Sequence, residues 1–62
     1  MNNTNNAYKH TLFQNAEAYY NEAVELYEAG RRDDADYYDT CFREIFAKIR
    51  ALGWDKEYMG IA

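Results

Sequence analysis

The sequence predicts an all-α fold, an antiparallel two-helix hairpin with a short C-terminal tail. Two observations carry this prediction. The chain has no proline and only three glycines, and apolar residues recur at helical spacing on both sides of residues 30 to 33. A connection this short forces two consecutive helices to run antiparallel. We treat residues 1 to 62 as one helical-hairpin domain, because a chain of this length buries only about 60% of the surface that it exposes when unfolded.

We expect the first helix at about residues 7 to 29. Its apolar residues alternate between spacings of four and three, which is the pattern of a heptad seam. These positions are Leu12, Ala16, Tyr19, Ala23, Leu26 and Gly30. Thr4 or Asn6 can cap the start of the helix, because a short side-chain oxygen accepts an unpaired backbone N–H of the first turn. Gly30 can end it in the left-handed conformation.

We expect a turn at residues 30 to 33 and the second helix at about residues 34 to 52. The second seam has the same spacing and comprises Ala35, Tyr38, Phe42, Ile45, Ile49 and Leu52. Asp33 can cap this helix, and Gly53 can end it. Trp54 would then pack back on Ile49, at the start of a tail of residues 53 to 62 in which Asp55 can cap a further turn.

The two seams should face each other. Antiparallel pairing places Leu12 opposite Leu52 and Ala16 opposite Ile49. Large side chains then tend to meet small ones, as interdigitated packing prefers. This agreement supports the hairpin independently of the helical spacing.

Eleven aromatic residues are more than one seam can bury. Positions adjacent to the seam gather on one edge of the hairpin and form a second apolar face. It comprises Phe13, Tyr20, Val24, Tyr27 and Phe46. The tail could fold over its Phe13 and Phe46 end, a second copy could bury it in a four-helix bundle, or a different protein could dock on it. We expect a homodimer, since the nine residues after Gly53 are too few to reach Tyr27 as well.

The net charge of −4 is concentrated in residues 16 to 39, which hold eight acidic and only two basic residues. The predicted acidic partner surface lies mainly at the loop end. It comprises Glu22, Glu25, Glu28, Asp33, Asp34, Asp36 and Asp39. Phosphate would be repelled by this segment, so we expect no direct binding of nucleic acid. The surface either keeps the protein soluble or docks on a basic surface of another protein.

Residues that carry chemistry are scarce. His10 is the only histidine and Cys41 the only cysteine, which excludes an intrachain disulfide, a four-ligand zinc site and a Ser-His-Asp triad. An EF-hand loop beginning at Asp34 would require a glycine and a glutamate where Asp39 and Ile45 stand. We therefore expect no enzymatic activity, no metal and no cofactor.

The sequence also bears on where the protein works. No apolar stretch approaches the roughly 20 residues that span a bilayer, and we read no secretory signal in the first residues. With a free thiol in addition, we expect a cytoplasmic protein without a membrane partner.

One family resemblance supports the hairpin. An aromatic, a small residue, a tyrosine, a glycine and an alanine stand at set offsets, namely Tyr19, Ala23, Tyr27, Gly30 and Ala35. On these residues the segment from 16 to 49 resembles a single tetratricopeptide repeat, which implies a helical hairpin that binds protein. The sequence departs from the repeat at Asp39 and Phe42 and lacks its closing proline.

These observations together predict a small, non-enzymatic protein-binding or regulatory module. It would act through the aromatic face and the acidic loop end. The alternative is an acidic inhibitor that imitates nucleic acid and so occupies a nucleic-acid-binding protein, as small phage or plasmid-borne antagonists can.

Overall fold

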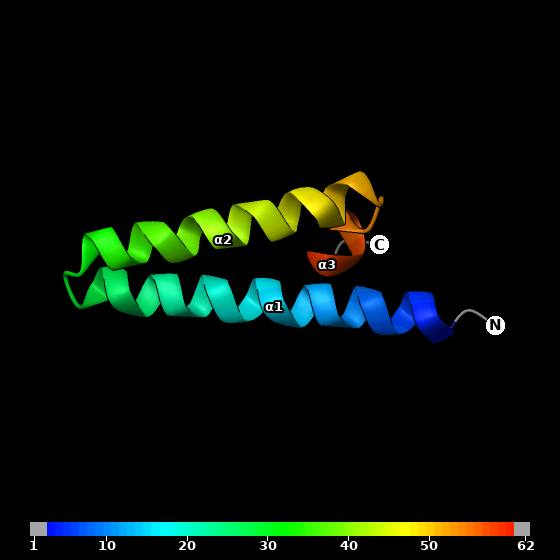
Figure 1. Ribbon diagram of the computed structural model, residues 1–62, viewed down its shortest axis with the longest axis horizontal. Helices are drawn as coiled ribbons and strands as arrows, with labels where there is room; N and C mark the ends of the chain where they lie inside the picture. The colour runs from blue at the N-terminus through cyan, green and yellow to red at the C-terminus, as the bar shows by residue number, and fades with distance from the viewer. Residues whose placement is uncertain (1–2, 61–62) are drawn as a thin grey trace.

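The computed structural model describes residues 3 to 60, and their side chains from Asn6 onward. The chain forms α1 (Asn3–Glu28), α2 (Arg32–Ala51) and α3 (Asp55–Tyr58), and no strand occurs in the described part. Figure 1 shows α1 and α2 side by side and antiparallel, with α3 folded back between their far ends. The predicted all-α hairpin is therefore confirmed.

Gly30 ends α1 as the sequence predicted. Its φ angle is 81°, in the left-handed region that favours glycine. The backbone N–H of Gly30 donates to the carbonyl of Tyr27 at 3.0 Å, and that of Arg31 donates to the carbonyl of Leu26 at 2.9 Å. These two bonds form a Schellman motif, which pairs carbonyls that the last helical turn leaves free.

Gly53 ends α2 in the same way. Its φ angle is 78°, its N–H donates to the carbonyl of Arg50 at 3.0 Å, and the N–H of Trp54 donates to the carbonyl of Ile49 at 2.9 Å. The reversal turns Trp54 back onto the core cluster that contains Ile49, as predicted. It thereby directs the following residues of α3 toward α1.

The predicted N-caps are wrong. Thr4 and Asn6 lie inside α1, Asp33 lies inside α2 and Asp55 lies inside α3. No side chain caps α2 or α3. The acidic residues of the first turn still lie near the positive end of the α2 dipole, and this charge interaction stabilises the helix start without a capping hydrogen bond.

The buried side chains come from the predicted seams. They are Leu12, Ala16, Leu26, Ala35 and Ile49. Leu12, Ala16 and Ile49 form the centre of the core, and Trp54 and Tyr58 pack against them. The core therefore combines the far end of the hairpin with the segment that follows α2.

Leu52 departs from the predicted pairing. Its side chain is 47% exposed, and Leu12 clusters with Ile49 instead. α2 begins at Arg32, two residues before the predicted start. The shorter connection brings each α2 residue level with an earlier residue of α1 than predicted, so the far end of the seam changes its partners.

The difference between Ile49 and Leu52 can be measured. Ile49→Ala removes a fully buried side chain, and we expect a loss of about 2–5 kcal/mol in the free energy of unfolding. Leu52→Ala shortens a half-exposed side chain, so we expect a loss below about 1 kcal/mol. Urea unfolding followed by circular dichroism at one fixed protein concentration gives both values. Equal losses would contradict the register described here.

Candidate protein-interaction face

The helix α3 covers one end of the predicted aromatic face. The ring of Tyr58 lies 5.2 Å from that of Phe13 and 6.1 Å from that of Phe46, between ring centroids. Both phenylalanines are half-buried as a result. The tail therefore shields the Phe13 and Phe46 end, which was one of the three arrangements left open by the sequence.

A group of contacts ties α3 and the residue before it to the start of α1. The Lys9 Nζ lies 3.0 Å from the Glu57 carboxylate and 5.4 Å from the centroid of the Trp54 ring. The ring of Tyr8 meets that of Trp54 edge-on at 6.3 Å. A cation that contacts both a carboxylate and an aromatic face holds the short helix more firmly than either contact would alone.

The rest of the predicted face stays exposed. The exposed fractions are 53% for Tyr20, 36% for Val24 and 60% for Tyr27. Met59, at the end of α3, is also 60% exposed. Four residues of helix are too few to extend from Phe46 to Tyr27, so α3 leaves the half of the face nearest the loop uncovered.

An open groove continues this exposed surface toward α3. It has a volume of about 680 Å³ and is lined by Tyr20, Phe42, Phe46, Tyr58 and Met59. Its floor is aromatic, because the Phe42 ring stacks on that of Phe46 at 5.8 Å and meets that of Tyr20 at 5.6 Å. We call the groove together with Val24 and Tyr27 the aromatic strip.

Carboxylates border the strip near the loop. A smaller hollow of about 140 Å³ lies there between Val24 and Tyr27 on α1 and Asp36 and Asp39 on α2. The Arg43 Nε lies 3.0 Å from the Asp39 Oδ2. An apolar surface with an acidic border is suited to a protein segment that carries both apolar and basic side chains.

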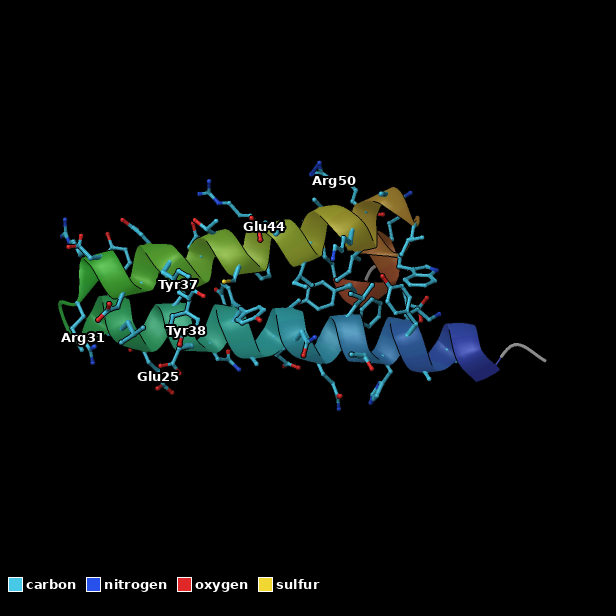
Figure 2. All side chains as sticks on the ribbon, in the orientation of Figure 1. Glu25, Arg31, Tyr37, Tyr38, Glu44 and Arg50 are labelled. Atoms are coloured by element: carbon cyan, nitrogen blue, oxygen red, sulfur yellow. The ribbon has the colours of Figure 1, made fainter. Side chains whose placement is uncertain are left out.

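The structure does not gather the predicted acidic surface into one patch. Glu25 points away from α2 (Figure 2). Glu25 precedes Tyr27 by two residues, and Glu22 follows Tyr20 by two residues, which is about 200° around the helix in each case. Both glutamates therefore lie on the side of α1 away from these tyrosines. Asp34 accepts a hydrogen bond from the Arg31 Nε at 3.0 Å.

The remaining members of the predicted acidic surface, Glu28 and Asp33, are exposed near the loop. Arg32 lies at the same end, with its guanidinium carbon 5.4 Å from the centroid of the Tyr27 ring. Acidic and basic side chains are therefore mixed at the loop end, and Asp36 and Asp39 are the two predicted acidic residues that line the hollow beside the strip.

A second aromatic group lies on the other side of the hairpin. Tyr38 contacts Tyr19 at 6.2 Å and Tyr37 at 5.1 Å between ring centroids, and Figure 2 shows Tyr37 and Tyr38 close together. Cys41 raises the pKa of Tyr37 by charge repulsion and by a side-chain hydrogen bond. Tyr37 precedes Phe46 by nine residues, half a turn around α2, so it faces away from the strip.

Sequence reasoning missed part of the groove lining. The sequence predicts Phe42 in the seam, and it offers the tail, which contains Tyr58 and Met59, only as a possible cover of the face. The spacing of four between Trp54 and Tyr58 is the available signal, since it places both on one side of a helix. Nothing in that spacing indicates that Met59 would be left exposed beside Tyr58.

Comparisons with known proteins give no relative from which a role of the aromatic strip could be inferred. No protein-family model, curated protein or solved structure matches the chain. The likeness to a tetratricopeptide repeat therefore rests on its five residues alone. Across residues 3 to 60, no three His, Cys, Asp or Glu side chains lie close enough to hold a metal ion. None of the described helices has the length and hydropathy to cross a membrane.

Burial of Tyr58 beside the groove should make the free energy of unfolding depend on pH in the alkaline range. Burial raises the pKa of Tyr58 above its usual 10.0, with further contributions from Glu17 and Tyr20. A raised pKa means that folding favours the neutral phenol, so its contribution is complete below pH 10 and is lost as the pH rises through the folded-state pKa. We expect Tyr58→Phe to lose less stability than the wild type between pH 9 and pH 11.5.

Thermal unfolding followed at several pH values measures this difference. Tyr27→Phe is the matched control, because it removes a hydroxyl group from an exposed ring of α1. Equal losses of stability in the wild type and in Tyr58→Phe would contradict the assignment.

Proposed function

We propose that this protein is a small, non-enzymatic protein-binding module whose aromatic strip is covered by another protein chain. The observation that carries the proposal is the exposure of Tyr20, Tyr27 and Met59 beside an aromatic groove. Proteins that act as monomers rarely expose large contiguous apolar patches. Tyrosine is also favoured at the centres of interfaces, because its ring buries much area at a low cost in side-chain entropy.

The chemistry of the covering chain follows from the border of the strip. Asp36 and Asp39 favour a lysine or an arginine over the hollow near the loop. The groove near α3 favours an aromatic or aliphatic side chain, because its floor is formed by Phe42 and Phe46. The module would thus bind a surface that presents an apolar anchor and a basic residue together.

The alternative, an acidic inhibitor that imitates nucleic acid, has weaker support. Such an inhibitor needs a continuous array of uncompensated negative charge. Glu22 and Glu25 lie on the side of α1 away from the strip, while Asp34 and Asp39 are paired with arginines. The strip therefore supports the binding module better than the acidic residues support the inhibitor.

Site-specific photo-crosslinking in the cells that naturally produce the protein tests the proposal. A benzophenone amino acid replaces Tyr20 in one variant and Tyr37 in another. Both positions are exposed, but Tyr37 lies on the opposite side of the hairpin. We expect protein adducts from position 20 at several times the yield from position 37, because the strip is covered by a protein chain.

The yield of adduct decides the outcome, whatever the captured chain is. Circular dichroism spectra of both variants first establish that each remains helical. Equal yields from positions 20 and 37, or no adduct from position 20, would overturn the proposal.

A further inference from the structure

We propose that the chain covering the aromatic strip is a second copy of this protein, packed antiparallel about a twofold axis that passes beside Tyr20. In this dimer, Tyr27 of each copy enters the groove of the other copy, against Phe46 and Tyr58. The inference rests on the proposed function and names the partner. The spacing of the strip, the shape of its two halves and the charges along one edge of α2 support this arrangement.

The spacing of the strip is symmetric about Tyr20. Tyr27 lies seven residues after Tyr20 in α1, which is about 10 Å along the helix. Phe13 lies seven residues before it, at the level where Tyr58 fills the space between the helices. A twofold rotation at Tyr20 that reverses the helix direction therefore brings Tyr27 of one copy to the level of the other copy's groove.

The two halves of the strip differ in shape. The half nearest the loop carries the exposed ring of Tyr27, whereas the half nearest α3 is hollowed into the groove of about 680 Å³. Antiparallel packing puts the ring of each copy into the hollow of the other, twice per dimer. Parallel packing would set the two grooves against each other and leave both unfilled. The residues that line them would then lose the van der Waals contacts that Tyr27 could make.

Charges along α2 complement one another in the same arrangement. Asp36, Arg43 and Arg50 follow each other at intervals of seven residues, so they share one edge of the helix. The twofold axis passes at the level of Tyr20 and Phe42 and reverses the direction of α2. It therefore places Asp36 of each copy beside Arg50 of the other, so the dimer contains two such pairs. Arg43 lies near the axis, close to Arg43 of the other copy. Its ion pair with Asp39 offsets the repulsion between the two arginines.

The size of the hairpin is sufficient for a stable dimer. The molecule measures 45 × 21 × 16 Å, and its two long helices lie side by side across the broad face. A standard protein interface buries roughly 800 Å² on each partner, which is close to the area of such a face. Dimerisation would also enlarge a core that contains only five buried side chains among the described residues of one copy.

The first test is the mass of the whole protein in solution. Light scattering at increasing concentration should approach twice the 7.4 kDa of one chain. Tyr27→Ala should raise the dissociation constant of the dimer at least tenfold, while Tyr37→Ala, on the opposite side, should leave it unchanged. A mass of 7.4 kDa at every concentration would overturn the inference.

Crosslinking then tests the orientation of the two copies. In a Cys41→Ser background, one preparation carries Tyr27→Cys and a second carries Met59→Cys, which lines the groove. A short bis-maleimide should give its main product when the two preparations are mixed, because residue 27 of one copy then faces residue 59 of the other. The second contact of this mixed dimer, between an unaltered Tyr27 and an unaltered groove, stays intact. A dominant product from Tyr27→Cys alone would instead indicate parallel copies and contradict the antiparallel arrangement.

A charge exchange supplies a test that does not alter the aromatic residues. Asp36→Arg and Arg50→Asp should each raise the dissociation constant about tenfold, because each places like charges together. The double variant should return to within about threefold of the wild type, since both pairs are restored with reversed sign. Failure of the double variant to recover would contradict the pairing of these two residues.

These outcomes separate the dimer from the proposed function. If the chain is a monomer and position 20 crosslinks only to a different protein, the second copy is excluded and the binding module stands. If position 20 yields no protein adduct and the mass stays at 7.4 kDa, both proposals fail. Adducts of one chain with another copy of itself would support both.

Discussion

The contact between Ala16 of α1 and Ile49 of α2 is the interaction on which the rest of the structure depends. Neither residue retains any exposed surface, and the small alanine gives the larger isoleucine room to pack between the helices. The carbonyl of Ile49 also accepts the N–H of Trp54 that completes the reversal at Gly53. One residue thus joins the two long helices and directs the chain into α3.

The aromatic strip follows from the short reach of α3. This helix shields Phe13 and Phe46 through Tyr58, and its end leaves Met59 exposed at the margin of the groove. The chain therefore stabilises itself at the end farthest from the loop and leaves its apolar surface uncovered toward the loop. A surface of this kind, fixed on rigid helices, gives up little conformational entropy when another chain covers it.

The success of sequence reasoning depended on how local each feature is. Every residue that is buried in the described part of the chain lies in one of the two seams predicted from helical periodicity, and the left-handed preference of glycine predicted the ends of α1 and α2, because both are properties of short segments. The prediction for Leu52 was wrong because the register across a hairpin depends on the loop, where a difference of two residues shifts the two far ends relative to each other. The N-caps were wrong since a cap contributes only about 1 kcal/mol, which packing overrides. The groove required the position of α3, and that depends on tertiary contacts of Trp54 and Tyr58.

The short connection between Glu28 and Arg32 has a consequence for how the chain assembles. Closing so small a loop costs little entropy, and most contacts of a helical protein lie within its helices, between residues that are near one another in sequence. Chains with such contacts fold in microseconds to milliseconds. Aromatic side chains that would otherwise promote aggregation are thus exposed on an unfolded chain only briefly.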